Sequence, residues 1–397
     1  MTTRNPAPKK FSIPIGPQHP ALKEPGHFEL NIEGEVVTGG AVRLGYAHRG
    51  IEKAAESRSY TQNLYMMERV CGICSHIHAM AFAMAAEQLA GVTVTPRAQA
   101  IRTLVAEMER IHSHMLWLGV AAHQAGFDTL FMYSWRDRET IMDCLEQLAG
   151  NRVNYSVNLL GGVKYDVTPE IAESIRGGVT FLEERMQHYL NVVTGDPVFL
   201  QRTRGIGTMD RATAIRLGVI GPTARASGLA RDLRADAPYA AYAEHRINVI
   251  THVTGDLEAR FIVRLRELLE SIRLIRELLD TLPEGDLLTR MPRRIPAGEA
   301  IVRVEAPRGE LFYFIQGNGT DIPARVKIRT PSIANIASVL KIAVGSQLAD
   351  VPMILAGVDP CFSCNDRLVT LHTADDRSTW DWEDLRRYGI DYYGRRS

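Results

Sequence analysis

The chain has 397 residues, of which 45% are hydrophobic, so it can bury one large core or two closely packed ones. Its 46 Lys and Arg residues equal its 46 Asp and Glu residues, and this balance gives no reason to expect nucleic acid as a partner. The sequence contains no run of 18 uncharged apolar residues and no apolar leader near its first residue, so it predicts neither a membrane-spanning helix nor a secretory signal.

Turn residues and hydrophobic periodicity predict the elements in chain order. Alternating apolar residues in the first 45 positions predict a small β-sheet or hairpins. Periodic patterns bounded by Gly or Pro predict helices over 75–90, 97–123, 129–150, 169–194 and 244–282, the last with a break near Thr254 and Gly255. The stretch 300–317 predicts a strand, a turn at Pro307–Gly309 and a second strand, and two helical pieces follow it.

These elements define a mainly α-helical fold with small β-sheets, an α+β chain built on a central bundle of long helices. We divide it into four segments. They are an N-terminal β region over 1–50, a helical core over 51–295, a β-hairpin with helices over 296–367, and a C-terminal extension over 368–397.

Four of the five cysteines form two C-x-x-C pairs, Cys71 with Cys74 and Cys361 with Cys364. In the cytoplasm, where thiols stay reduced, such pairs indicate metal ligands or redox thiols rather than structural disulfides. The pairs are much farther apart than those of a zinc ribbon, so only the fold can bring them together. Their spacing leaves open a single four-thiolate metal site, separate redox pairs and chance pairs, and it does not choose among zinc, iron–sulfur and rarer metals. Cys144 is predicted to be a core residue of a helix.

Asp359 and Pro360, just before the second pair, have the form of a helix start, with an N-cap residue followed by Pro at the first helical position. This pattern predicts that Cys361 and Cys364 lie in the first turn of a helix. The positive end of a helix dipole lowers thiol pKa values, which would suit an anionic metal–thiolate centre.

The residues around the cysteines resemble a known family. "RVCGICSHIHA" and "DPCFSCNDR" closely resemble the two cysteine motifs of the nickel–iron (NiFe) hydrogenase large subunit. Arg367, where uptake hydrogenases have His, is similar to the membrane-associated, energy-converting group, which includes formate hydrogenlyase and the Ech-type enzymes. "GPQHPALKEPGHFEL", "AHRGIEKAAE", "RASGLARDLRADAPY" and "VEAPRGE" extend the resemblance over nearly the whole chain. The quinone-site subunit of respiratory complex I shares several of these segments but lacks the four cysteines, so their presence here favours a hydrogenase.

The resemblance implies the large-subunit fold and a reversible reaction that combines two protons and two electrons into H2, with H2 evolution as the expected direction. All four sulfurs would bind nickel in a Ni-Fe centre. Cys74 and Cys364 would also bridge to iron, which carries CO and cyanide (CN) ligands, whereas Cys71 and Cys361 would be terminal. Cys361 is the implied first base, and no Fe–S cluster is expected in this chain.

The resemblance also assigns roles to other residues. Glu24 occupies the place of the family's proton-transfer glutamate. Arg308, which follows Pro307, matches an arginine held over the metal pair, with Asp359 as its partner. His78 is similar to a histidine that hydrogen-bonds a cysteine sulfur. Without the resemblance, these side chains would be interpreted as surface charges and a packed histidine.

Two positions depart from the pattern of the uptake hydrogenases. Ser113, between His112 and His114, stands where those enzymes have Asp, so one carboxylate near the metals is missing. Arg367 stands where a His helps a glutamate, here Glu52, to bind magnesium or iron. We expect a Glu52–Arg367 ion pair in place of that ion.

The resemblance implies processing and partners as well. Related subunits lose a C-terminal extension, and we predict cleavage between Arg367 and Leu368 by a nickel-checking maturation protease, with nickel chaperones supplying the metal. A small subunit with a 4Fe–4S cluster and ferredoxin-like and antiporter-like membrane subunits are implied, on the cytoplasmic side of the cytoplasmic membrane. Two other classes remain open, a complex I-like quinone or electron-transfer module without nickel, and a structural zinc protein.

Overall fold

The computed structural model describes residues 10–366, 369–372, 377–380 and 382–394. The helices are α1 Ile51–Ala55, α2 Tyr60–Glu68, α3 Ser75–Ala90, α4 Pro96–Gln124, α5 Asp128–Ala149, α6 Pro169–Gly195, α7 Pro197–Gln201, α8 Arg211–Arg216, α9 Gly221–Arg225, α10 Leu233–Asp236, α11 Leu257–Asp280, α12 Pro331–Ala343, α13 Val351–Val358 and α14 Trp382–Gly394, with 3₁₀ turns η1 Ala240–Ala243 and η2 Leu348–Asp350. The strands are β1 Lys10–Ile15, β2 His27–Glu33, β3 Val36–Arg43, β4 Asn158–Leu159, β5 Gly162–Val163, β6 Gly298–Ala306, β7 Gly309–Gly317, β8 Arg325–Arg329, β9 Val369–His372 and β10 Arg377–Trp380.

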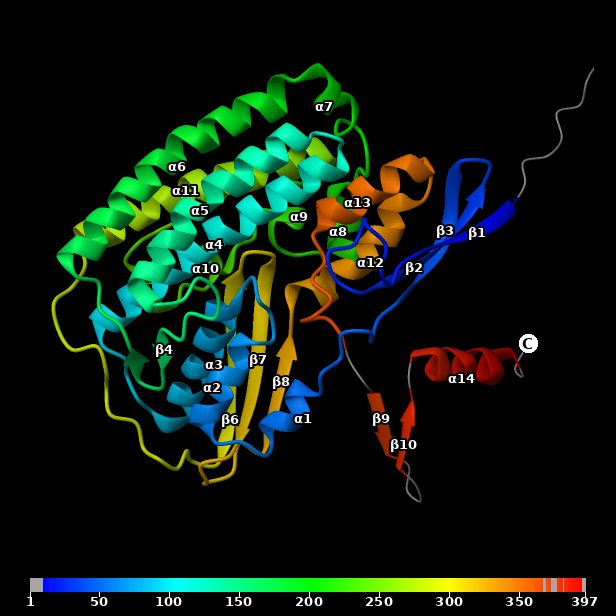
Figure 1. Ribbon diagram of the computed structural model, residues 1–397. Coiled ribbons are helices and arrows are strands. Elements are labelled where there is room, and N and C mark those ends of the chain that lie inside the picture. The colour runs from blue at the N-terminus through cyan, green and yellow to red at the C-terminus, as the bar shows by residue number, and fades with distance from the viewer. Residues whose placement is uncertain (1–9, 367–368, 373–376, 381, 395–397) are drawn as a thin grey trace, which may run out of the picture.

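The long helices α4, α5, α6 and α11 form a bundle, seen in the upper part of Figure 1. α4 and α6 each pack against both α5 and α11. Both begin in the same way, with a Thr side chain accepting a hydrogen bond from the first turn and Pro as the next residue. Most side chains of α4 are buried on all sides, which makes it the central helix of the bundle.

The antiparallel sheet β6-β7-β8 lies below the bundle, with α3 packed against β6 and β7 (Figure 1). Ala306 pairs with Gly309, so Pro307 and Arg308 form a two-residue turn between β6 and β7. The turn approaches Gly221 so closely that a Cβ on Gly221 would lie 2.3 Å from the carbonyl oxygen of Arg308. Glycine at this position therefore lets the Arg308 turn reach the interior of the protein.

The N-terminal antiparallel sheet β1-β2-β3 packs through β3 against α12. The loop between β1 and β2 contains Glu24 and ends at Gly26. A Cβ on Gly26 would lie 2.5 Å from a ring carbon of Phe362, which stands between Cys361 and Cys364. Because Gly26 has no Cβ, the N-terminal loop can lie directly against the segment that carries the second cysteine pair.

Buried ion pairs join the bundle to the sheet. Arg225 bonds to Glu267 of α11 at 2.7 Å and to Glu305 of β6 at 2.8 Å. Arg234 bonds to Glu107 of α4 at 3.0 Å. Both arginines belong to the segment "RASGLARDLRADAPY", whose charged side chains therefore hold layers of the fold together in the protein interior.

The structure confirms the mainly helical fold with small sheets, the N-terminal sheet, the hairpin and the predicted helices before residue 196. The prediction for 244–282 was wrong in its first part, because the helix begins only at Leu257. Gly255 adopts a left-handed φ of 67° and the Asp256 side chain caps α11 by accepting a hydrogen bond from Ala259 N–H. The periodic residues before Gly255 thus run in irregular backbone.

Cys144 is buried in α5, as predicted, and a Cβ on Gly178 of α6 would lie 2.9 Å from its sulfur. Beyond residue 368, β9 and β10 pair with each other, and the hairpin and α14 lie beside the main body in Figure 1. Within α14, Tyr388, Ile390 and Tyr393 are exposed. The four predicted segments stay a prediction.

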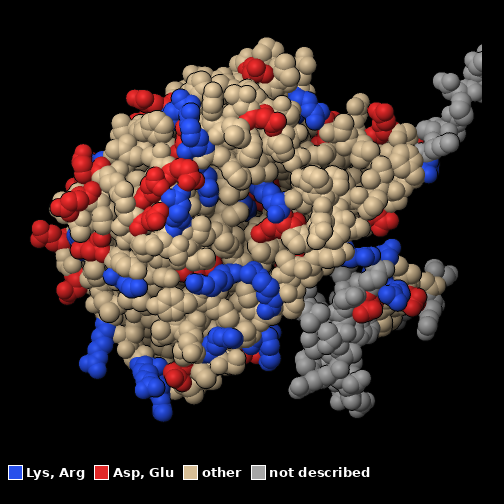
Figure 2. All heavy atoms as spheres, viewed as in Figure 1, with Lys and Arg blue, Asp and Glu red and all other residues tan. Residues whose placement is uncertain are grey.

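On the face seen in Figure 2, acidic side chains gather over the long helices and basic ones along the lower edge, so neither sign covers the whole face. Among the described residues, no helix combines the length and apolar character that crossing a bilayer requires.

Candidate metal centre

The fold brings the two cysteine pairs together. Residues 69–74 between α2 and α3 are called here the first cysteine loop, and residues 359–366 after α13 the second cysteine loop. The sulfur of Cys71 lies 3.1 Å from that of Cys74 and 3.6 Å from that of Cys361, although Cys71 and Cys361 are 290 positions apart in the sequence. These cysteines and Cys364 are each at most 3% exposed.

The thiols of the buried cluster differ in the direction of their pKa shifts. Hydrogen bonds from the thiols of Cys361, Cys364 and Cys74 hold the pKa of the Cys71 thiol well below its usual range. The hydrogen bond to Cys71, together with burial, raises the pKa of Cys74 well above its usual range. A thiolate surrounded by further thiols is a strong ligand set for a soft metal ion.

The second cysteine loop does not begin a helix. Asp359 ends α13 in the left-handed conformation, with φ 59° and ψ 52°. Cys361 and Cys364 lie in turns, where the backbone N–H groups of Asn365 and Asp366 donate to the carbonyl of Phe362. The predicted helix start at Asp359 and Pro360 was therefore wrong, and no helix dipole acts on these thiols from that side. Asp is one of the few residues that accept left-handed backbone, a role the Asp-Pro pattern does not reveal.

Side chains from other segments hold the second cysteine loop in place. The hydroxyl of Ser332 accepts a hydrogen bond from the N–H of Cys361 at 2.9 Å. The hydroxyl of Thr330 donates to the carbonyl of Cys364 at 3.1 Å. Both residues lie at the start of α12, so the helix start fixes the position of the loop.

Glu24 binds the same loop from the N-terminal side. Its carboxylate accepts hydrogen bonds from the N–H of Ser363 at 2.9 Å and from the Ser363 hydroxyl at 2.6 Å. The sulfur of Cys361 lies 3.8 Å from the nearer Glu24 oxygen and 3.3 Å from the Ser363 hydroxyl. The structure thus places Glu24 within reach of a cysteine sulfur, both directly and through Ser363.

Arg308 lies beside the sulfurs, 4% exposed. Its guanidinium pairs with the Asp359 carboxylate at 2.9 Å, donates to the Asp359 carbonyl at 3.0 Å and donates to the hydroxyl of Ser113 at 3.3 Å. Burial opposes its charge, but Asp359 and the sulfurs of Cys74, Cys361 and Cys71 raise its pKa well above the usual range. Pro307, which precedes Arg308 in the turn between β6 and β7, is also buried. The predicted pairing of Arg308 with Asp359 is therefore present, and Ser113 is a third member of the group.

Lys23 is a further cation at this point. Its ammonium lies 2.7 Å from the Asp359 carboxylate, and its side chain is 20% exposed. Burial lowers the pKa of Lys23, with Arg308 contributing in the same direction and Asp359 opposing it. For Asp359, burial opposes ionisation, but Arg308 and Lys23 hold its pKa below the usual range. Two cations therefore contact one carboxylate, which leaves positive charge to balance a bound anionic group.

Arg264 of α11 adds to the positive charge near Asp359. Its guanidinium lies over the ring of Trp117 at 4.1 Å from the centroid and is 2% exposed. Burial lowers its pKa to about 10, and the charges of Arg308 and Arg225 act in the same direction. A fixed cation in such a dry site is stabilised by any anion that binds nearby.

The predicted histidines occupy different environments. The Nδ1 atom of His78 lies 2.8 Å from the hydroxyl of Tyr313, and its predicted bond to sulfur stays a prediction. The Nδ1 atom of His112 accepts a hydrogen bond from Arg138 at 2.7 Å, while its buried Nε2 has no hydrogen-bond partner among the described residues. His114 bonds to a glutamate of α11 at 3.1 Å.

Glu52 accepts hydrogen bonds from the ammonium of Lys327 at 2.8 Å and from the N–H of Ile328 at 2.9 Å. Arg367, its predicted partner, lies outside the described residues, as does the predicted cleavage site between Arg367 and Leu368. The ion pair and the cleavage therefore stay predictions.

The residues fit a nickel–iron centre by the type of their donors. The sulfurs supply soft thiolate ligands, and Arg308 supplies fixed donors beside them. Buried polar atoms near the cysteines also lack partners in the described part of the chain: Nε2 of His112 and both amide atoms of Asn365 in the second cysteine loop. Burial, Arg138 and Arg308 lower the pKa of His112 well below its usual range, and Cys71 opposes this shift. Within the described residues, no three His, Cys, Asp or Glu side chains are arranged around a common point as metal ligands would be. The sulfurs of Cys71 and Cys74 instead lie in contact at 3.1 Å.

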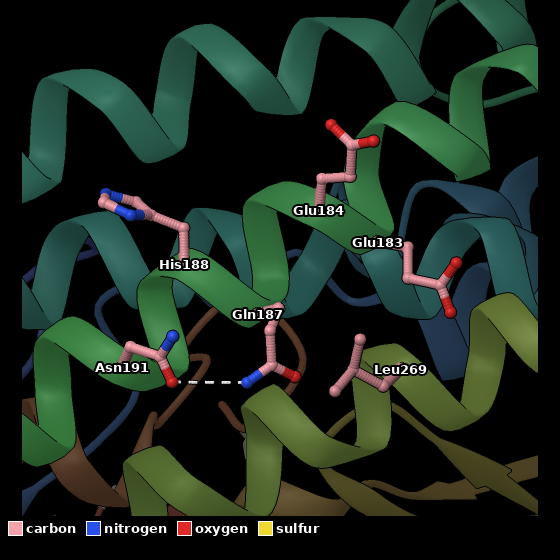
Figure 3. A pocket seen from close by; sticks show the side chains of 6 residues that line it. All are labelled: Glu183, Glu184, Gln187, His188, Asn191 and Leu269. Atoms are coloured by element: carbon pink, nitrogen blue, oxygen red, sulfur yellow. Dashed lines mark hydrogen bonds between the residues drawn. The ribbon is translucent and has the colours of Figure 1, made fainter.

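A surface hollow of about 660 Å³ lies elsewhere on the molecule. It is lined by Leu269 of α11 and by Glu183, Glu184, Gln187, His188 and Asn191 of α6 (Figure 3). Gln187 and Asn191 bond to each other at 3.3 Å, while Glu184 and His188 extend from the other side of the helix in Figure 3. None of the four clustered cysteines, and none of the residues bonded to them, lines this hollow.

The structure and the site define an α+β protein with a buried four-cysteine cluster. The family model described as "Respiratory-chain NADH dehydrogenase, 49 Kd subunit" matches residues 124–295 and 289–367, and the one described as "Nickel-dependent hydrogenase" matches residues 49–120. The chain therefore belongs to the family that joins hydrogenase large subunits with the 49 kDa subunit of respiratory NADH dehydrogenase, and its fold is that of this family.

Curated relatives come from both branches. The carbon monoxide-induced hydrogenase of Rhodospirillum rubrum is 39% identical over 90% of this chain and 99% of the relative. The membrane-bound hydrogenase subunit alpha of Pyrococcus furiosus is 38% identical over 90% and 87% of the two chains. An NADH-quinone oxidoreductase subunit of Clostridium beijerinckii is 36% identical over 90% and 98%. A chain in the structure of the membrane-bound sulfane sulfur reductase, an archaeal respiratory membrane complex, has a TM-score of 0.85 at 33% identity, covering 91% of this chain and 99% of that one.

Sequence reasoning missed three residues of the site. Lys23 precedes Glu24 and Ser363 stands inside the second C-x-x-C pair, so adjacency to predicted site residues was the signal that could have found them. The third, Arg49, donates to the carbonyls of Val70 and Ser363 at 2.8 Å each and lies in "AHRGIEKAAE", a motif in which only Glu52 was assigned a role.

Proposed function

We propose that this chain is the catalytic subunit of a membrane-associated nickel–iron hydrogenase that interconverts H2 with two protons and two electrons. The observation that carries the proposal is the buried contact among the sulfurs of Cys71, Cys74 and Cys361, with Arg308 and Asp359 fixed beside them. Four soft donors and a guanidinium suit a metal centre that carries small anionic ligands such as cyanide.

The chain's own residues divide the work in this proposal. When bound, a nickel–iron centre with CO and cyanide on iron supplies the chemistry that splits or forms H2. Cys71, Cys74, Cys361 and Cys364 would hold it. Arg308 keeps its orientation through Asp359 and Ser113, so its remaining donor capacity is directed at the site without reorganisation.

Three contacts in the structure support a proton path. The sulfur of Cys361, which would carry the proton, lies 3.3 Å from the hydroxyl oxygen of Ser363, and this hydroxyl donates to Glu24 at 2.6 Å. The hydroxyl can accept one proton and release another, so it carries the proton to the carboxylate without moving its oxygen. The direct distance of 3.8 Å between sulfur and carboxylate is long for a hydrogen bond, which favours the route through Ser363.

The electrons need a partner. The described chain uses four of its five cysteines at one site, and Cys144 is packed in the core. We therefore assign the electron relay to a small subunit with a 4Fe–4S cluster, and membrane attachment to ferredoxin-like and antiporter-like subunits. In this proposal the chain is peripheral, on the cytoplasmic side of the cytoplasmic membrane, and depends on nickel chaperones and a maturation protease.

A complex I-like electron-transfer module without nickel is the second candidate. The match of the 49 kDa family model to residues 124–295 and 289–367 favours it, as does the NADH-quinone oxidoreductase relative. The four clustered cysteines favour hydrogenase, because a quinone site has no need for soft metal ligands.

Metal analysis and H2-dependent dye reduction decide between the candidates. The complex is purified without air from cells that express the maturation proteins, in wild-type, Cys71→Ser and Cys144→Ser forms. We expect stoichiometric nickel and H2 oxidation in the wild type and in Cys144→Ser, and loss of both in Cys71→Ser. A folded complex without nickel would support the electron-transfer module, and stoichiometric zinc without nickel would support a structural zinc site.

A further inference from the structure

One side chain bonds to the backbone of both cysteine loops. The guanidinium of Arg49 donates to the carbonyl of Arg69 at 2.6 Å and to that of Val70 at 2.8 Å, both in the first cysteine loop. It also donates to the carbonyl of Ser363 in the second cysteine loop, again at 2.8 Å. Val70 immediately precedes Cys71, and Ser363 lies between Cys361 and Cys364. The three bonds therefore act one or two residues away from the sulfurs.

The segment around Arg49 is itself attached to the second cysteine loop. The N–H of Ala47 donates to the carboxylate of Asp366 at 2.5 Å. Gly45 and Gly50 bound this segment with φ values of 117° and 65°, conformations that other residues rarely adopt. The segment that carries Arg49 is thus bounded by two bends and bonded directly to the second cysteine loop.

We propose that Arg49 is a positioning residue that holds the two cysteine loops at the separation needed to bind one metal centre. The inference rests on the proposed function, in which both loops bind the same centre. The loops are far apart in the sequence and follow different helices, α2 and α13, and neither is part of a β-ladder that would fix the other. A planar guanidinium can donate to three carbonyls at once, so it fixes distance and angle together.

Lysine cannot replace this arrangement. An ammonium on a flexible stem keeps the charge but does not present donors in a fixed plane. Arg49→Lys should therefore keep contact with one loop and release the other. Arg49→Gln should release both, because its shorter side chain does not span them.

The accessibility of the thiols tests the inference without any metal. The full-length chain is prepared from cells grown without nickel, in wild-type, Arg49→Lys, Arg49→Gln and Arg58→Gln forms. Arg58 is the matched control, because its exposed guanidinium donates to the carbonyl of Ala54 at 3.2 Å, away from both loops. Alkylation of each cysteine by iodoacetamide is followed over time by peptide mass spectrometry, with the buried Cys144 as the internal reference for global unfolding.

We expect Cys71 and Cys361 to react about tenfold faster in Arg49→Gln than in the wild type. In the wild type the loops must break their hydrogen bonds to Arg49 before the thiols are exposed, and in the variant these bonds are absent. Arg49→Lys should show a smaller increase, and Cys144 should keep its wild-type rate in all forms. Unchanged rates for Cys71 and Cys361 in Arg49→Gln would overturn the inference. A parallel rise at Cys144 would overturn it too, because it would show general destabilisation instead of a local opening.

A second measurement separates this inference from the proposed function. Wild-type and Arg49 variant chains are loaded with limiting nickel in the presence of the maturation proteins, and bound nickel is measured. A wild type that binds no nickel contradicts the proposed function and leaves the alkylation result intact. If the wild type and Arg49→Gln bind nickel equally well, the result contradicts the positioning role of Arg49 but not the proposed function.

Discussion

Glu24 and Ser363, which are 339 positions apart, are joined by two hydrogen bonds, from the Ser363 N–H at 2.9 Å and from its hydroxyl at 2.6 Å. The pair places a carboxylate from the N-terminal loop next to the sulfur of Cys361. A loop carboxylate that is fixed in this way has a defined distance to the reacting group, which general acid–base catalysis requires.

Glu24→Gln should slow turnover without disturbing the metal site. The amide oxygen can still accept the hydrogen bond from Ser363 N–H, but the amide cannot carry a proton, so we expect H2 oxidation to fall about 10²-fold or more. Turnover and H2–D2O exchange are measured, with Glu29→Gln as control, because exposed Glu29 also accepts a hydrogen bond from a serine hydroxyl, at 3.0 Å from Ser12. Equal rates in Glu24→Gln and the wild type would remove Glu24 from the proton path.

Ser363→Ala isolates the relay from the carboxylate. The variant keeps the backbone bond to Glu24 but leaves only the direct 3.8 Å approach of Cys361 to Glu24. We expect turnover to fall about tenfold, with a larger solvent isotope effect than in the wild type. Ser363→Thr, which retains the hydroxyl, should restore most of the rate; a Ser363→Ala enzyme as fast as the wild type would show that the proton takes another route.

Arg308→Lys should weaken catalysis while keeping the local charge. A lysine cannot bond at once to the Asp359 carboxylate, the Asp359 carbonyl and the Ser113 hydroxyl. We expect a loss of about 100-fold in turnover, comparable to the removal of one fixed donor from an active site. The control is Arg303→Lys on the exposed side of β6, and similar rates for both variants would contradict the role of Arg308.

His114 should make the protein less stable in acid. Burial lowers the pKa of His114 to about 4 from 6.5, despite its bond to Glu267. The unfolded chain therefore binds more protons than the folded chain between these two values, so the free energy of unfolding decreases as the pH falls through this window.

Because of His114, the free energy of unfolding should fall by about 3 kcal/mol between neutral pH and pH 4. Denaturant unfolding of wild type and His114→Gln over this range measures it, since Gln keeps a donor for Glu267 but does not titrate. The wild type should lose stability more steeply in acid than His114→Gln. Parallel curves would show that His114 does not contribute to the acid sensitivity.

Local patterns predicted the helices before residue 196 and the β6–β7 hairpin well, because periodicity, Pro and Gly act within a few residues. The same reasoning misplaced Asp359. Its neighbours suit a helix start, but its side chain pairs instead with Arg308 and Lys23, which approach from distant segments of the chain. Only the tertiary structure contains that information.

In the site too, some residues could be recognised from the sequence and others only from the tertiary structure. The four cysteines were singled out by their C-x-x-C spacing and Arg308 by resemblance to a family, whereas the role proposed for Arg49 rests on its hydrogen bonds to the two cysteine loops. An arginine that bonds to carbonyls leaves no mark in the sequence, because every residue has a carbonyl. Such contacts become visible only once the fold brings distant segments together.

Infrared spectroscopy tests the central claim most directly. The complex is purified without air from cells with intact maturation proteins, and the region where iron-bound CO and cyanide absorb is recorded for the wild type and Cys361→Ser. The account predicts CO and cyanide bands in the wild type that are absent from Cys361→Ser. A folded wild-type complex without these bands would contradict the assignment of the four cysteines to a nickel–iron centre.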